Sequence, residues 1–139
     1  MDFHTTRPSN KVYSMADLTA GGVSSRRGIS SRGGVAHAVI LNGKYGDSDT
    51  FHTIHYGGEG GMDQFGLVTM DQKMEQGNRA LIMAYMTGAN VMVFRGSKAM
   101  AYPCTKAGRF RFDGSYMVSG WWKEHNQQDA LIYRFKLTR

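Results

Sequence analysis

The segment ALIYRFKL, residues 130–137, restricts the fold more than any other part of the 139-residue chain. Apolar and basic residues alternate along it, which places the two kinds on opposite faces of an extended strand. The apolar face consists of Leu131, Tyr133, Phe135 and Leu137, and the basic face of Arg134 and Lys136. We therefore predict that the chain ends in a β-strand that covers a hydrophobic core with one face only.

Four further segments are predicted to be strands, because β-branched and aromatic residues dominate them. They are VAHAVIL (35–41), TFHTIHY (50–56), NVMVFR (90–95) and SYMVSGWW (115–122). The first is apolar throughout except for one histidine, which predicts burial on both faces. In the second, Ile54 and Tyr56 should point to one face and His55 to the other. Of the adjacent Trp121 and Trp122, one ring should pack in the core.

Helical patterns are fewer. The segment VYSMADL (12–18) predicts a short helix or turn, and an apolar stripe predicts a helix, or two short pieces, within 69–86. The stripe consists of Met74, Leu81 and Tyr85. Thr69 and Gln72 have the spacing of a capping box at the start of that helix. The Gly-, Ser- and Arg-rich segment 19–34 is predicted to be a loop.

These elements predict a mainly β (α+β) fold, with a sheet curled or closed into a barrel around one or two short helices. Residues 1–11 are polar and are expected to be a flexible arm, which leaves one domain over residues 12–139. The length suits a single domain with a sizeable core.

Charge and cysteine content restrict the partners and the compartment. The formal net charge is +6 and the isoelectric point about 9.6, which suits a polyanion such as nucleic acid. The single cysteine, Cys104, excludes an internal disulfide and is expected to be an inert thiol. No apolar run approaches the ~20 residues of a membrane span, and the N-terminus lacks a signal-peptide pattern. We expect an intracellular protein without a membrane partner.

Two tyrosines on glycine-rich segments are the candidate functional residues. Tyr45 lies in LNGKYGDSD (41–49), among small and acidic residues, and Tyr56 lies in IHYGGEGG (54–61). Considered alone, such tyrosines are usually half-buried aromatic residues at strand ends, and Asp47 and Asp49 are usually turn residues.

Two other kinds of site are disfavoured by the residues themselves. GGEGG lacks the GK[ST] ending of a phosphate-binding loop. His52 and His55 would face opposite sides of a strand, which disfavours a metal site.

Six blocks, taken together, resemble the SET-and-RING-associated (SRA or YDG) domain family in order and spacing. They are GGVSSRRGISSRGGVAHAVILNGKYGDSD, IHYGGEGG, MDQKMEQGNRAL, VMVFRG, RFRFDGSYMVSGWW and LIYRFKLTR. The resemblance runs from about residue 12 to residue 139. It implies a twisted β-barrel of the SRA and PUA-like type, and a domain that reads modified cytosine in DNA by flipping the base into a pocket.

The resemblance also implies the base-binding residues. Tyr45 and Tyr56 would stack on the two faces of the flipped base, which replaces the stacking lost from the duplex. Asp47, or as second choice Asp49, would accept a hydrogen bond from the cytosine amino group. The other residues implied at the pocket are Asn42, Gly43, Lys44, Gly57 and Glu59. Arg26, Arg27 and Arg32 would contact the DNA backbone.

This sequence departs from the family pattern at several positions. The signature tripeptide reads Phe112, Asp113, Gly114, and Lys44 stands where relatives usually have glycine. The segment MDQFGLVTM (62–70) is short and lacks the basic finger of vertebrate relatives, which makes recognition of hemimethylated CpG by that finger doubtful. Gln64 or Phe65 is the candidate to fill the vacated space instead. These departures favour tolerance of a larger substituent on the cytosine.

The resemblance predicts a non-catalytic reader of 5-methylcytosine or 5-hydroxymethylcytosine in double-stranded DNA, without cofactor or metal. The alternative is the recognition module of a modification-dependent restriction system, in which an HNH-type nuclease partner or a missing segment cuts the DNA. A third possibility is a barrel that contacts RNA or protein. The expected compartment is the cytoplasm for a bacterial or phage protein and the nucleus for a eukaryotic one.

Overall fold

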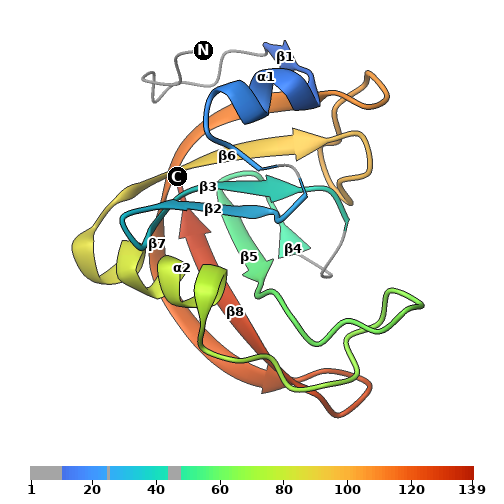
Figure 1. Cartoon of the computed structure of the whole chain (residues 1–139), viewed down its shortest axis with the longest axis vertical. Helices are drawn as coiled ribbons and strands as arrows, with labels where there is room; N and C mark the ends of the chain where they lie inside the picture. Colours follow the sequence, from blue (N-terminus) through green and yellow to red (C-terminus); the bar gives the residue numbers. More distant parts are fainter. Residues whose placement is uncertain (1–10, 25, 44–47) are drawn as a thin grey trace.

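The computed structural model describes residues 11–24, 26–43 and 48–139. It contains one curved sheet and two helices, α1 (Met15–Ala20) and α2 (Gln76–Thr87) (Figure 1). The strands are β1 (Val12–Tyr13), β2 (Ile29–Arg32), β3 (Val35–Leu41), β4 (Ser48–Asp49), β5 (Thr53–Gly57), β6 (Asn90–Gly96), β7 (Phe110–His125) and β8 (Leu131–Thr138). In the described part of the chain, neither helix is long and apolar enough to cross a membrane.

The strands follow the order β2-β3-β6-β7-β8-β5-β4, and β1 pairs with one end of β7. Strands β3 and β6 run parallel, and the other described pairs are antiparallel. No pairing among the described residues joins the edge strands β2 and β4. The mainly β class is therefore confirmed, but the sheet is curled and open, and the prediction of a closed barrel is wrong.

The sheet is buried on both faces where β3 and β6 lie. Alternate residues of β3 enter two separate cores, which confirms the prediction that this strand has no solvent face. The α2 core contains Val39, Leu41, Val91, Val93, Leu81 and Ala84. The α1 core contains Leu18, Ala38, Ile40, Phe94, Phe110 and Phe112. The two helices therefore cover opposite faces of the sheet.

The helices begin at positions other than those predicted. Helix α1 has the capping box: Ser14 Oγ accepts a hydrogen bond from Asp17 N, and Asp17 Oδ2 accepts one from Ser14 N, both at 3.1 Å. The predicted box of Thr69 and Gln72 is wrong, because the Gln72 amide is buried and bonds to other loops. Helix α2 begins only at Gln76, and it is one uninterrupted helix.

Strand β2 lies inside the segment that was predicted to be a loop. Ile29 and Ser30 are buried, and the strand pairs with β3 across a two-residue turn. Gly33 and Gly34 both have positive φ, 57° and 78°, as a tight primed hairpin turn requires. The prediction of a loop over residues 29–32 is therefore wrong: the glycines of this segment form the turn of a β-hairpin.

The C-terminal strand has the predicted inner face, with Tyr133, Phe135 and Leu137 buried. The prediction for the tryptophans is wrong, since Trp121 and Trp122 are each 36% exposed. Strand β7 is longer than predicted, and residues 121–125 at its far end are all exposed. The Trp122 ring instead packs edge-on against His55. His55 lies on the face of β5 opposite to the buried Tyr56, as the alternation along that strand predicts.

Candidate nucleic-acid interface

The segment between β3 and β5 carries most of the predicted base-binding residues, and only its ends are described. Lys44, Tyr45 and Asp47 lie outside the described residues. At the near end, Asn42 Oδ1 accepts a hydrogen bond from Lys98 N at 3.0 Å. Gly43 has φ of 79°, and a Cβ there would lie 2.6 Å from Lys98 O. A glycine is required at this position, both for the backbone angle and for the close approach of the neighbouring loop.

Tyr56 is described, and its ring lies in the core with 4% of the residue exposed. Its hydroxyl group donates to the carbonyl oxygens of Gly28 at 3.1 Å and Ile40 at 3.3 Å. These bonds tie the ring to the residue before β2 and to β3, which fixes its orientation.

Asp49 lies at the far end of the same segment, and both its oxygens are engaged. Arg95 donates from Nε and Nη2 to the Asp49 carboxylate, each at 2.8 Å, and the two side chains are 0% and 4% exposed. Asp49 Oδ1 also accepts from Phe51 N at 2.8 Å. With these hydrogen bonds Asp49 anchors the end of the segment to Arg95.

Arg95 is the centre of a buried ion-pair cluster that sequence reasoning missed. Its Nη1 donates to Asp113 Oδ2 at 2.5 Å, and Asp113 is 1% exposed. Burial by itself lowers the pKa of Arg95, but the hydrogen bonds to Asp49 and Asp113 outweigh it, so the pKa is raised. The guanidinium also lies 4.7 Å from the centre of the Phe51 ring. Arg95 therefore stays charged in the interior, and it ties the predicted base-binding segment to the sheet.

The tripeptide Phe112, Asp113, Gly114 positions this cluster. Between the pairs Met92–Ser115 and Phe94–Phe112, β7 has one residue more than β6, which is a β-bulge. Gly114 sits in the bulge with φ of 96°, an angle that favours glycine. Asp113, also in the bulge, is thereby placed against Arg95. Asp113 and Gly114 precede the strand predicted at 115–122, so neither the bulge nor the partner of the Asp was evident from the sequence.

The glycine loop after Tyr56 is held by two buried amides. Gln72 Nε2 donates to Gly58 O at 2.7 Å, and Gln72 Oε1 accepts from Tyr133 N at 2.9 Å. Asn78 Oδ1 accepts from Glu59 N at 2.8 Å, and its Nδ2 donates to Glu59 O at 2.9 Å. A Cβ on Gly58 would lie 2.8 Å from both amide oxygens, so the loop backbone fits only as glycine here.

Glu59 caps helix α2 from outside the helix. Its Oε1 accepts from Gly77 N at 2.8 Å, while Glu75, the residue at the N-cap position, makes no side-chain cap bond. A carboxylate also interacts favourably with the positive end of the helix dipole. This contact gives Glu59 a structural role in addition to the base-binding role implied by the resemblance.

Replacing Glu59 with alanine is expected to lower the free energy of unfolding by about 0.5–2 kcal/mol, because the first turn of α2 loses its acceptor. Urea denaturation followed by tryptophan fluorescence measures the change. Glu75→Ala is the matched control, and it should cost less because that carboxylate bonds to no cap N–H. Equal costs for the two variants would contradict the capping role.

Two of the three predicted backbone-contacting arginines, Arg26 and Arg27, line a cleft beside the glycine loop. Arg26, Arg27 and Arg32 are all exposed. Arg27 Nη2 donates to Gln76 Oε1 at 2.8 Å and lies 3.5 Å from Glu59 Oε1. A cleft of ≈ 500 Å³, lined by Arg26, Arg27 and Glu59 among others, opens at this point. The structure thus brings two of the arginines together beside the loop that follows Tyr56.

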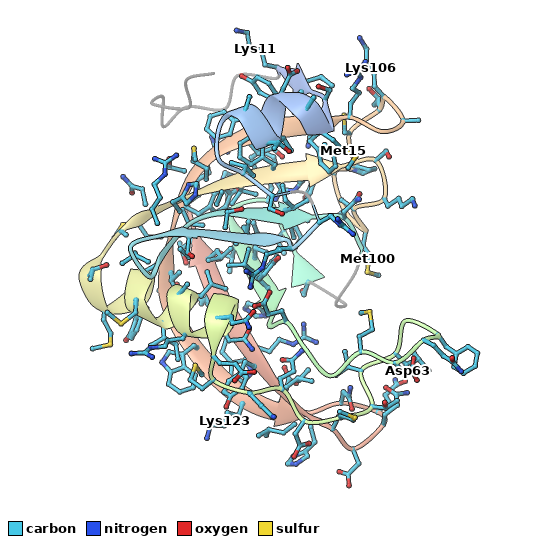
Figure 2. The ribbon with its side chains drawn as sticks, viewed as in Figure 1. Lys11, Met15, Asp63, Met100, Lys106 and Lys123 are labelled. Atoms are coloured by element: carbon cyan, nitrogen blue, oxygen red, sulfur yellow. The ribbon has the colours of Figure 1, made fainter. Side chains whose placement is uncertain are left out.

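The hairpin of residues 62–70 projects from the body of the molecule, as the position of Asp63 shows (Figure 2). Asp63 Oδ1 accepts hydrogen bonds from Phe65 N at 2.8 Å and Leu67 N at 3.0 Å. Phe65 is 79% exposed at its tip. The hydrogen-bonded turn therefore exposes the large apolar ring of Phe65 to solvent.

Metal chemistry gains no support from the described residues. No group of three or more His, Cys, Asp or Glu side chains among them lies close enough to hold a metal ion. Cys104 is buried, and its backbone N–H donates to Gly96 O at 3.1 Å.

The fold is thus a curved, mainly β sheet with a cleft that Arg26, Arg27 and the glycine loop line. The family model of the SAD/SRA domain matches residues 10–139. The chain therefore belongs to the SAD/SRA domain family.

Similar proteins include plant histone methyltransferases. The chain is 33% identical over 109 residues to the H3 lysine-9 specific SUVH1 of Nicotiana tabacum, covering 76% of this chain and 15% of that protein. It is 32% identical over 108 residues to a YDG domain-containing protein of Arabidopsis thaliana, covering 76% of this chain and 32% of that one. The chain thus spans a third or less of these curated relatives.

Two solved structures show the same fold. The modification-dependent TagI restriction endonuclease is 28% identical with a TM-score of 0.85, over 96% of this chain and 50% of that one. The SUVH5 SRA domain bound to fully hydroxymethylated CG DNA is 28% identical with a TM-score of 0.77, over 100% of this chain and 91% of that one.

Proposed function

We propose that this domain is a non-catalytic reader that binds double-stranded DNA at a modified cytosine and flips that base out of the duplex. The observation that carries the proposal is the similarity to SUVH5 SRA over the whole chain. That domain has been solved with fully methylated, hemimethylated and hydroxymethylated CG DNA, at 26–28% identity and TM-scores of 0.76–0.79. We place the protein inside the cell with its DNA, in the nucleus if it is eukaryotic and in the bacterial cytoplasm if it is a bacterial or phage protein.

In this proposal Tyr45 and Tyr56 stack on the flipped base, and Asp47 accepts a hydrogen bond from its amino group. Each stacking contact is worth about 1–3 kcal/mol, which offsets the few kcal/mol lost on unstacking. The remaining polar contacts to the base come from the backbone of Asn42, Gly43 and Gly57. The close approach of Lys98 O to Gly43 holds that part of the backbone in place.

The remaining site residues contact the rest of the duplex. Arg26, Arg27 and Arg32 bind phosphates, and Lys44 lies at the mouth of the pocket. Phe65 enters the space left by the flipped base, as apolar wedges do in other DNA complexes. The role proposed for Phe65 is supported by the exposure of its ring on a hydrogen-bonded turn.

A titration followed by fluorescence anisotropy tests the proposal. One duplex should carry cytosine, 5-methylcytosine or 5-hydroxymethylcytosine at a single site, on one strand or both, at fixed salt. We expect a preference of tenfold or more, about 1.4 kcal/mol, for at least one modified form. Equal affinity for all forms would contradict the reader function and direct attention to RNA or protein partners.

A second candidate is the recognition module of a modification-dependent restriction system. The similarity to TagI favours it, and the chain covers only half of that enzyme. In this case a partner nuclease, or a segment outside this chain, cuts the DNA. Mixing the domain with a candidate nuclease and modified plasmid distinguishes the two, because a reader alone leaves the plasmid uncut.

A further inference from the structure

The connection between β6 and β7, residues 97–109, is a second exposed basic segment of the molecule. It contains Lys98, Lys106 and Arg109 and no acidic residue. All three side chains are exposed, and so are Met100 at 74% and Tyr102 at 48%. Figure 2 shows Met100 and Lys106 on the same side of the molecule, above the hairpin that carries Asp63. We refer to residues 97–109 as the β6–β7 loop.

The β6–β7 loop contacts the predicted base-binding segment directly. Lys98 N donates to Asn42 Oδ1 at 3.0 Å, and Lys98 O is the atom that leaves no room for a Cβ on Gly43. The Tyr102 ring packs edge-on against Phe51, with 5.3 Å between ring centres. The loop therefore touches both described ends of the segment that carries Tyr45 and Asp47.

The buried ion-pair cluster holds the same two segments. Arg111 Nη2 donates to Tyr102 O and to Asp113 Oδ2, at 2.6 and 3.0 Å. Asp113 in turn binds Arg95, which binds Asp49. Phe51 and Tyr102 both have positive φ, 73° and 52°, a strained conformation for non-glycine residues that persists only where surrounding contacts enforce it. One cluster thus fixes the β6–β7 loop relative to the base-binding segment.

We propose that the β6–β7 loop binds the sugar-phosphate backbone of the DNA strand that carries the flipped base, an inference that rests on the proposed function. Lys98, Lys106 and Arg109 contact the phosphates beside the flipped nucleotide. The reasons are the three exposed basic side chains in a loop that contains no acidic residue, the contacts of the loop with Asn42 and Gly43, and its hydrogen bonds to Arg111. Phosphate contacts of this kind position the duplex and carry no base specificity.

The test compares two double variants of the full chain that remove the same formal charge. Lys98→Ala with Lys106→Ala changes the loop. Lys123→Ala with Lys136→Ala is the matched control, since both residues are exposed on β7 and β8, and Lys106 and Lys123 lie toward opposite ends of the molecule (Figure 2). Affinity for a modified and an unmodified duplex is measured between about 50 and 200 mM salt, the range in which phosphate contacts change affinity steeply.

The loop variant is expected to bind both duplexes more weakly by the same factor, on the order of tenfold, and to lower the salt slope by about 2. The control variant should change the slope by less than about 1. A charge-preserving variant, Lys98→Arg with Lys106→Arg, should retain the wild-type slope.

Equal slopes for the loop and control variants would overturn the proposal. A selective loss of affinity for the modified duplex would also overturn it, because a backbone contact affects all duplexes alike. If the wild-type domain binds both duplexes equally, the proposed reader function fails, and the comparison of slopes still decides whether the loop contacts DNA.

Discussion

Replacing Arg95 with methionine is expected to lower the free energy of unfolding by about 3–5 kcal/mol, the usual cost of removing one member of a buried ion pair. The carboxylates of Asp49 and Asp113 are 4% and 1% exposed, and Asp49 would lose both its contacts with the guanidinium. Such a loss is a large part of the 5–15 kcal/mol that stabilises an ordinary domain. Urea denaturation followed by tryptophan fluorescence measures it.

The control for this variant is Glu124→Gln. Glu124 accepts from Arg134 at 2.8 Å, but its side chain is 43% exposed, so this pair should contribute less than about 1 kcal/mol. If Arg95→Met costs no more than this control, the buried cluster does not hold the fold together. A related consequence concerns binding: any folded fraction of Arg95→Met should lose affinity for modified DNA, because the segment before Asp49 is no longer anchored.

Replacing Tyr45 with alanine is expected to weaken binding to a modified duplex by about 1–3 kcal/mol, since one stacking surface for the flipped base is lost. The affinity for an unmodified duplex should change much less, because backbone contacts supply most non-specific binding. The free energy of unfolding should remain close to that of the wild type. Anisotropy titration with the two duplexes measures the selectivity directly.

Tyr85→Ala is the matched control for the loss of an aromatic ring. Tyr85 is 43% exposed on helix α2, outside the proposed pocket, so both affinities should stay at the wild-type level. Tyr45→Phe should retain most of the binding, because the ring and not the hydroxyl group stacks on the base. An unchanged preference in Tyr45→Ala would show that the proposed pocket is wrong.

The comparisons also limit what can be assigned to this chain. The similarity to tobacco SUVH1 covers 15% of that methyltransferase, and the similarity to TagI covers half of that endonuclease. Neither methyl transfer nor DNA cleavage is therefore implied for these residues. The two similarities cover 76% and 96% of this chain, which the SAD/SRA family model matches over residues 10–139.

The sequence alone determined the elements in which short-range pattern and burial agree. Alternation in residues 130–137 correctly predicted the inner face of β8, and the apolar composition of 35–41 correctly predicted a strand buried on both faces. The six family blocks identified the SAD/SRA family, which the family model confirms. These features were accessible because side-chain periodicity and block order are properties of the chain itself.

Only the tertiary structure decided the partners of the buried polar groups. Gln72 had the spacing of a helix cap, yet its amide bonds to Gly58 and Tyr133, because a buried amide must find partners wherever the fold brings them. Asp49 similarly pairs with Arg95, which lies 46 residues away in the sequence, and no local pattern indicates that partner. The open sheet and the exposed tryptophans have the same cause: long-range pairing determines which strand faces are covered, and no local pattern specifies it.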